Sequence, residues 1–429
     1  MSRGKAHRRG WLGRFIRRCM RFRPWAIRRT PPRRARAPID HVIILDGTMS
    51  SLEEGLETNA GTLYKLLNEA ANGGRLSLYY EAGVQWQSWR SLREVITGRG
   101  INRKIRRAYG VLASRYRPGD RIFLFGYSRG AFAARSLAGM IDRVGLLRAE
   151  HATPRNIRQL WRHYRNDPHS PAARAFAAAH CHREVTIEMI GVWDTVKSLG
   201  LRLPFLWRLS ERRHAFHSHH LGHSVRHGYH ALALDETRQA FAPVLWEYPE
   251  GWPGTVEQMW FRGSHADVGG HLGGFEAARP LANIPLVWML EKAEGLGLPL
   301  PAGWHARFPC DPMAEMLGCW RGWGKIFLLR CRRQPGQDRS ERIHPSVHLS
   351  VPNRRRAGAP AACAEGGAAE RLPWSFLRVS FAGRKDDDTG RRHCRGETGR
   401  GGGMAAEGGR GGALAGGLPG KGTGGDPGG

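Results

Sequence analysis

Short runs of consecutive apolar residues recur through the middle of the chain and predict buried β-strands. A run that is apolar at every position, without alternation, is typical of a strand covered on both faces, as in a parallel sheet between two layers of helices. The expected strands are residues 41–46 (HVIILD), 76–80 (LSLYY), 121–125 (RIFLF), 185–194 (VTIEMIGVWD) and 256–261 (VEQMWF).

Segments with helical periodicity lie between these runs. Residues 58–70 begin with Thr58 and Asn59, side chains that cap helices. Residues 101–116 place four apolar side chains on one helical stripe, namely Ile101, Ile105, Ala108 and Leu112. Alternation of strands and helices indicates an α/β fold, and we expect an α/β-hydrolase-like, mostly parallel sheet with helices on both faces across residues 40–351.

One serine stands where a buried strand meets a helix. In the stretch FLFGYSRGAF, Ser128 lies between Gly126 and Gly130, after an apolar run and before an alanine-rich segment. A G-x-S-x-G pattern alone is a weak signal, but the strand–turn–helix setting is that of a nucleophile elbow. Glycines are needed there because Cβ atoms would collide with the neighbouring strand and helix. We therefore expect Ser128 to be a nucleophile.

A serine nucleophile needs a base, and the base needs an acid that orients it. In α/β hydrolases these residues follow in the order serine, acid, histidine. Asp194 ends the apolar run IGVWD, and His265 lies in the glycine-flanked stretch WFRGSHADVGG after another run. The competing interpretations are a helix-capping aspartate and a structural loop histidine. We predict a triad of Ser128, Asp194 and His265.

The transition state of ester cleavage also needs donors for an oxyanion. The backbone N–H of Arg129, at the expected start of a helix, is one candidate. Gly47 or Thr48, in the loop after the first strand (ILDGT), would supply the second. Asp46 would anchor that loop through hydrogen bonds or, alternatively, hold a cation.

Other residues could take the same roles. His271, His344 and His348 are alternative bases, and Asp267 is an alternative acid. Seven histidines lie between His214 and His230, with irregular spacing and no acidic residue, which favours solvated loop histidines over a metal site. Residues 199–209 (LGLRLPFLWRL) read either as a lid that contacts an interface or as buried packing.

Charge and composition change sharply at both ends of the chain. The formal net charge is +30, and residues 1–36 hold 14 Lys and Arg and no acid. We treat residues 1–39 as a basic arm with three interpretations: solvated, bound to anionic lipid head groups, or bound to nucleic acid. Residues 352–429 are rich in Gly, Arg and Ala and read as a low-complexity tail, or as a GC-rich gene read in a shifted frame.

The remaining composition excludes several classes of protein. Seven scattered cysteines without a C-x-x-C pair argue against a disulfide framework and a zinc module. No apolar run approaches 18 residues, and the N-terminus lacks a secretory signal peptide. Folding in the cytoplasm of the producing cell is the simplest expectation.

Several phrases together resemble one family. They are ILDGT, TNAGTLYKLL, YRPGDRIFLFGYSRGAFAARSLAGMI, IGVWDTVKSLG, HALALDETRQAF, WFRGSHADVGGHLGG and IPLVWMLEKAEGLGL. In this order they are similar to the α/β-hydrolase domain of type VI secretion phospholipase effectors, in the first class of those lipases. The resemblance covers about residues 41–351 and implies that nucleophile, acid and base fall on Ser128, Asp194 and His265. Many relatives have no known activity, so the resemblance alone does not fix a substrate.

The resemblance implies a serine hydrolase that cleaves acyl esters of phospholipids or other lipids, without a metal or organic cofactor. It also implies delivery by type VI secretion, contact with secretion-apparatus and immunity proteins, and peripheral contact with a membrane. We expect no specific nucleic-acid partner. Two rival hypotheses are a catalytically inactive hydrolase scaffold that acts as a binding module and a protein that binds nucleic acid through its basic arm.

Overall fold

Seven strands of the described residues form one sheet in which every neighbouring pair is parallel. Along the sheet the order is β2-β1-β3-β4-β5-β6-β7. The strands are β1 (Asp40–Leu45), β2 (Leu76–Glu81), β3 (Arg121–Tyr127), β4 (Ile187–Trp193), β5 (Val225–Ala233), β6 (Thr255–Phe261) and β7 (Glu341–Ile343). The order reverses between β1 and β3, and in open α/β sheets ligands bind outside the carboxyl ends of the strands at such a point.

The computed structural model of the protein describes residues 36–71, 75–83, 99–196, 221–321, 325, 327 and 329–349. The chain divides into two units, residues 1–358 and 359–429, and all described residues belong to the first. Residues 1–35 of the basic arm, residues 350 and 351, and the whole tail lie outside the described residues, so both domain boundaries stay predictions. The last residues of the arm that are described contact the sheet domain, since Arg36 pairs with Asp120.

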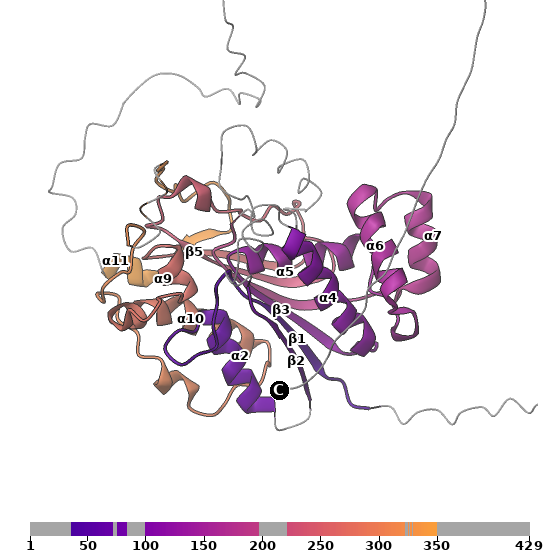
Figure 1. The fold of residues 1–429 in the computed structure, drawn as a ribbon, viewed down its shortest axis with the longest axis horizontal. Coiled ribbons are helices and arrows are strands. Elements are labelled where there is room, and N and C mark those ends of the chain that lie inside the picture. The colour runs from indigo at the N-terminus through magenta and orange to yellow at the C-terminus, as the bar shows by residue number, and fades with distance from the viewer. Residues whose placement is uncertain are drawn as a thin grey trace, which may run out of the picture. The chain divides into compact units, whose positions relative to one another are not determined.

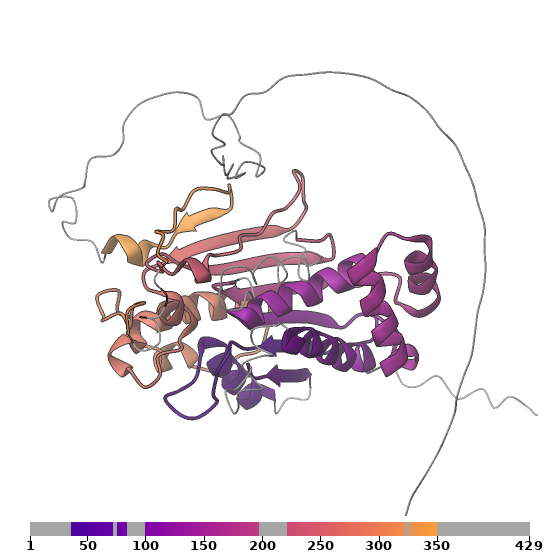
Figure 2. The same ribbon diagram turned by 45° about the horizontal axis from the view of Figure 1, so that its top comes forward.

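Helices cover both faces of the sheet (Figures 1 and 2). One face carries α4 (Arg99–Arg115) and α5 (Arg129–Arg143), with α6 (Pro154–Asn166) and α7 (Pro171–His180) packed outside them. The other face carries α2 (Asn59–Ala70) and α10 (Arg279–Gly295). Two short helical segments follow strands near the site: η3 (Gln239–Phe241) after β5 and α9 (His265–Gly269) after β6. A third, α11 (Pro345–Leu349), follows β7.

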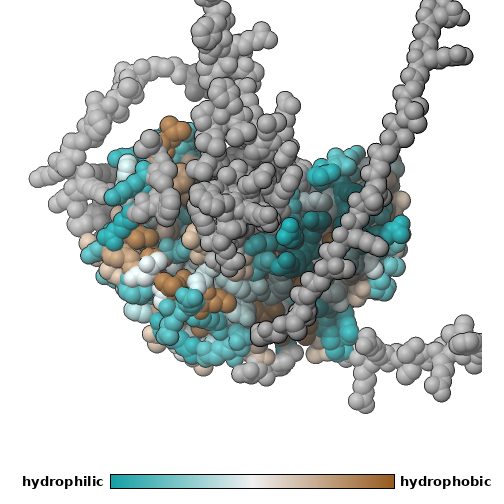
Figure 3. Space-filling view, in the orientation of Figure 1, coloured by the Kyte–Doolittle hydropathy of each residue, from teal (hydrophilic) through white to brown (hydrophobic). Residues whose placement is uncertain are grey.

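Local sequence signals set the ends of these helices. The Thr58 hydroxyl accepts a hydrogen bond from the N–H of Gly61 at the start of α2. Thr153 and Ser170 cap α6 and α7 in the same way, and each is followed by a proline in the first helical position. The outer surface around α6 and α7 is hydrophilic in the view of Figure 3, and these helices bury few side chains: Leu160, Trp161 and Tyr164 of α6, and Ala173 and Phe176 of α7.

Two buried clusters, one on each side of the sheet, make up most of the core. All six residues of β1 are buried, and β3 is buried from its second residue onward. The prediction of an α/β fold with helices on both faces is therefore confirmed. The five strands and two helices expected from the sequence also occur, with ends that differ by one or two residues.

Strands β5 and β7 were not expected from the sequence. β5 reads VRHGYHALA, in which Arg226, His227, Gly228 and His230 interrupt the apolar run. β7 has only three residues. The expectation of solvated loop histidines is wrong for His230, which lies in β5 and is fully buried, and His227 lies in the same strand. Residues 214–220 of that histidine-rich segment lie outside the described residues.

The buried His230 makes the stability of the fold depend on pH. Burial, together with the charge of Arg135, lowers the pKa of His230 to about 3. Its Nε2 accepts a hydrogen bond from the N–H of Thr195, which fixes the neutral ring beside the carboxyl end of β4. In the unfolded chain a histidine binds a proton near pH 6.5. Between these pH values the unfolded state holds one more proton, so the fold loses stability as the pH falls.

We expect His230→Gln to reduce this pH dependence, because the glutamine oxygen can accept the same hydrogen bond but binds no proton. The free energy of unfolding of the wild type should fall by about 1.4 kcal/mol more than that of the variant for each pH unit below about 6. Urea denaturation at pH 5.5 and 4.5 measures this difference. His348→Gln, at an exposed position on α11, is the matched control. Parallel losses in wild type and His230→Gln would contradict the assignment.

Candidate active site

Ser128 stands in a sharp turn between β3 and α5 at the carboxyl edge of the sheet. Its φ is +57°, in the left-handed region that a residue with a side chain rarely adopts. A Cβ atom on Gly126 would lie 2.6 Å from the carbonyl oxygen of Gly130, and one on Gly130 would lie 2.0 Å from that of Leu45. The two glycines thus let strand, turn and helix approach closely enough to hold the serine in this conformation.

His265 and Asp194 meet this serine from two other strand ends. Asp194 directly follows β4, and His265 is the first residue of α9, four residues after β6. Ser128 Oγ lies 2.8 Å from His265 Nε2, and His265 Nδ1 lies 2.5 Å from Asp194 Oδ2. The structure therefore brings together the three residues that the sequence analysis selected.

Asp194 is wholly buried and shares the backbone strain of the serine. Its φ is +38°, so two of the three non-glycine residues with positive φ in the described part of the chain are Ser128 and Asp194. Burial alone would raise the pKa of Asp194, but the charge of Arg333 and the hydrogen bond from His265 outweigh burial and hold that pKa well below its usual range. Because an ionised carboxylate can only accept, Nδ1 of His265 carries the proton and Nε2 is free to accept the serine hydroxyl.

Side chains that the sequence analysis did not select hold His265 in place. The Tyr127 ring stacks on the imidazole at 4.9 Å between centroids, and its hydroxyl donates to the carbonyl oxygen of His265. The Glu236 carboxylate accepts a hydrogen bond from the backbone N–H of His265 at 3.1 Å and is itself paired with Arg238. The phrase HALALDETRQAF contains Glu236 and Arg238, but the spacing of this phrase gave no reason to connect it with His265.

The loop after β1 lies next to the elbow, where a second oxyanion donor is expected. The Asp46 carboxylate accepts hydrogen bonds from the Gly47 N–H (2.6 Å), the Thr58 hydroxyl (2.7 Å) and the Tyr80 hydroxyl (2.7 Å). These contacts support the anchor interpretation of Asp46. Since the N–H of Gly47 already donates to Asp46, Thr48 is the better candidate for a donor from this loop.

The alternative bases and acid have other partners. His271 lies edge-on to the Tyr127 ring, and His344 Nδ1 contacts the hydroxyl of Ser346. His348 is exposed on α11. Asp267 accepts hydrogen bonds from the N–H and hydroxyl of Ser264 and from the N–H groups of residues 317 and 318. This carboxylate therefore ties the start of α9 to a later loop rather than orienting His265.

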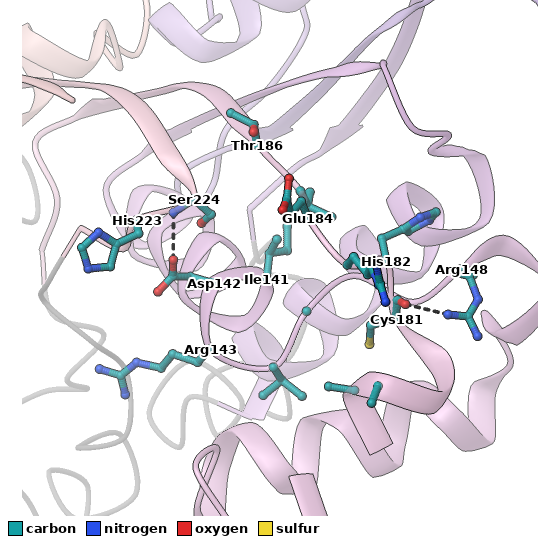
Figure 4. A pocket seen from close by; sticks show the side chains of 16 residues that line it. Ile141, Asp142, Arg143, Arg148, Cys181, His182, Glu184, Thr186, His223 and Ser224 are labelled. Atoms are coloured by element: carbon teal, nitrogen blue, oxygen red, sulfur yellow. Dashed lines mark hydrogen bonds between the residues drawn. The ribbon is translucent and has the colours of Figure 1, made fainter. Parts of the chain in front are cut away.

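A pocket of about 970 Å³ lies at the edge of the sheet opposite to Ser128 (Figure 4). It is lined by residues that precede β4 and β5 and by the end of α5, and it includes Cys181 and His182. Burial raises the pKa of the Cys181 thiol to about 11, which keeps the thiol protonated and unreactive at neutral pH. This pocket does not resemble a thiol active site.

The described residues form neither a metal-binding cluster nor a membrane-spanning helix. No group of three or more His, Cys, Asp or Glu side chains among them could hold a metal ion. Within the same residues, no helix is both long enough and apolar enough to cross a bilayer. The lid expected at residues 199–209 lies outside the described part of the chain.

Comparison with known proteins identifies the family. Residues 40–292, more than half of the chain, match the model of the catalytic domain of Tle1-like phospholipase effectors of type VI secretion. The chain belongs to this family. The resemblance seen in the sequence is thereby confirmed, and the Tle1-like domain contains all three residues of the Ser128–His265–Asp194 cluster.

Three individual proteins that match this chain share less than 30% of their sequence with it. The uncharacterized protein YEL023C of Saccharomyces cerevisiae is 29% identical over 226 residues, which cover 47% of this chain and 31% of the yeast protein. An uncharacterized protein from Pseudomonas aeruginosa is 17% identical, with a TM-score of 0.35 over 64% of this chain and 49% of that one. A Tle1 effector solved on the VgrG spike is 18% identical, with a TM-score of 0.27 over 55% and 52%. The chain thus spans about a third of the length of the curated yeast relative, and the family assignment rests on the match of residues 40–292.

Proposed function

We propose that this Tle1-like domain is a serine esterase that cleaves the acyl esters of phospholipids or other lipids. The observation that carries the proposal is the pair of hydrogen bonds from Ser128 Oγ to His265 Nε2 and from His265 Nδ1 to Asp194. It occurs at the carboxyl ends of three parallel strands in a member of a phospholipase effector family.

The first half of the proposed reaction acylates the serine. His265 Nε2 takes the hydroxyl proton of Ser128 while Oγ attacks the ester carbonyl carbon, and the carbonyl oxygen becomes an oxyanion. The N–H groups of Arg129, at the start of α5, and Thr48 stabilise that charge. The intermediate collapses when the protonated His265 gives its proton to the leaving alcohol, which departs as a lysophospholipid. Asp194 holds the ring and stabilises the imidazolium.

The second half releases the fatty acid. Water enters, His265 takes one of its protons, and the resulting hydroxide attacks the acyl carbon. The second tetrahedral intermediate then returns the serine oxygen, which regains its proton from His265. Each residue ends in its starting state, so the cycle needs no metal or organic cofactor. In the same proposal, the enzyme contacts membranes peripherally and is delivered by the type VI secretion apparatus, with immunity proteins protecting the producing cell.

The test uses the full chain and an activated-serine probe. We expect a fluorophosphonate to label the protein once, with mass spectrometry locating the label on Ser128. We also expect fatty acid to be released from vesicles of mixed phospholipids and release to stop after labelling. Labelling without release would retain the esterase and reject the lipid substrate. A folded protein that takes no label would support the alternative of an inactive scaffold.

A further inference from the structure

Arg333, from a loop beyond the family match, contacts the acid of the cluster. Its Nη1 lies 2.5 Å from Asp194 Oδ1 and its Nη2 lies 3.0 Å from Asp194 Oδ2, so the guanidinium donates a hydrogen bond to each carboxylate oxygen. The side chain of Arg333 is 4% exposed and that of Asp194 is fully buried. Such a fork between arginine and carboxylate fixes geometry as well as charge.

The remaining donors of Arg333 fix the guanidinium itself. Nη1 also donates to the carbonyl oxygen of Ala233, at the end of β5, and Nη2 donates to that of Phe241, in η3. The neighbouring N–H of Ala233 in turn donates to Asp194 Oδ1. Asp194 is therefore oriented by the end of β5 and by Arg333 together, and Oδ2 is left facing His265.

A cation on the acid also changes what the acid can do for the base. In a triad with an unpaired aspartate, the negative charge favours the imidazolium that forms when His265 takes a proton. A guanidinium within hydrogen-bond distance of the same carboxylate offsets that charge in a water-poor site, where charges interact more strongly. The Asp194–Arg333 pair therefore presents less negative charge to the imidazole than an unpaired aspartate would.

Other titratable groups besides Arg333 face these side chains. Tyr127 and Glu236 contact His265 directly. Arg238 is paired with Glu236. His271 interacts electrostatically with His265, and His230 with Asp194. Glu236 is the other carboxylate next to His265, and Arg238 holds it in a similar fork. Both carboxylates beside the imidazole are thus paired with an arginine.

We propose that Arg333 is a positioning residue of this site, which orients Asp194 and, through its charge, extends hydrolysis to lower pH than Ser128, His265 and Asp194 alone would allow. This inference rests on the proposed esterase activity. It assigns a role to a residue outside the segment that matches the family model.

The test compares the pH dependence of kcat/KM for 4-nitrophenyl butyrate in the full-length wild type, Arg333→Gln and Arg333→Lys. Gln removes the charge and keeps one amide donor, whereas Lys keeps the charge and loses the fork. We expect the acid limb to move up by about one pH unit in Arg333→Gln and to stay within about 0.3 unit of wild type in Arg333→Lys. Arg332→Gln removes the same charge from an exposed neighbour and should leave the limb unmoved.

The possible outcomes separate this inference from the proposed activity. A wild type that neither takes the fluorophosphonate nor cleaves the ester would reject the activity itself. An active wild type with an unmoved acid limb in Arg333→Gln, or with a limb moved equally in Arg333→Lys, would overturn the role of Arg333. If Arg333→Gln does not fold, Arg333→Lys is the deciding variant: a lowered kcat/KM with the acid limb of the wild type supports the role, and a wild-type kcat/KM or a moved limb overturns it.

Discussion

Replacing Ser128 with alanine is expected to lower kcat for ester hydrolysis by about 10⁴- to 10⁶-fold. The hydroxyl lies 2.8 Å from His265 Nε2, and its loss removes the atom that would carry the acyl group. Fatty-acid release from phospholipid vesicles and hydrolysis of 4-nitrophenyl butyrate measure the change. The matched control is Ser136→Ala, two turns further along α5, where the hydroxyl donates only to the carbonyl oxygen of Phe132. Ser136→Ala should retain wild-type rates within a few-fold.

The double variant sharpens this prediction. Residues that act as a unit give losses that do not add, so Ser128→Ala combined with His265→Ala should cost no more than Ser128→Ala alone. His271→Ala, in the neighbouring turn, should cost at most about tenfold. Independent, multiplying losses for Ser128 and His265, or a larger loss at His271 than at His265, would mean that the base is wrongly assigned.

Gly130→Ala is expected to have the largest effect on the fold, destabilising it by more than about 4 kcal/mol. The new Cβ would lie 2.0 Å from the carbonyl oxygen of Leu45 and 2.6 Å from that of Asp46. Both are backbone atoms of β1 and its loop, so neither can move aside as a side chain could. The start of α5 must instead shift away from β1, which also displaces the serine.

Thermal and urea denaturation measure this loss, with Gly295→Ala as the control. Gly295 ends α10, and a Cβ there would meet no atom within 4 Å. That variant should equal or slightly exceed the wild type in stability, because alanine favours the helix. A Gly130→Ala protein as stable as Gly295→Ala would show that β1 and α5 do not pack as closely as described.

The hydrophobic pattern of the sequence predicts much of the fold, and there is a physical reason why it missed the remaining strands. The strands that were predicted lie where both faces are buried by aliphatic and aromatic side chains, as in β1 and β3. β5 was missed because His230 and Gly228 stand at buried positions, where tertiary contacts satisfy the polar ring and Trp246 and Leu221 fill the space beside the glycine. Such tertiary contacts produce no periodic pattern in the sequence from which the strand could be predicted.

The candidate site likewise contains residues that the sequence predicts and one residue that it does not. Ser128, Asp194 and His265 could be selected because each follows a strand that the sequence reveals, and parallel strands bring their carboxyl ends to one edge. Arg333 could not, because the surrounding CRRQPGQDR has neither strand nor helix pattern. Its partner lies 139 residues earlier, and only the folded chain brings the two together.

These long separations determine when in folding the site can form. The serine and the histidine are 137 residues apart, the histidine and the acid 71, and the acid and Arg333 139. Contacts between such distant residues close large loops and tend to form after local structure. A chain still being synthesised therefore cannot assemble the complete site until Arg333 has left the ribosome. Under the proposed function, the appearance of esterase activity would then report the final step of folding, and the nascent chain would not hydrolyse the lipids of the membranes around it until that step.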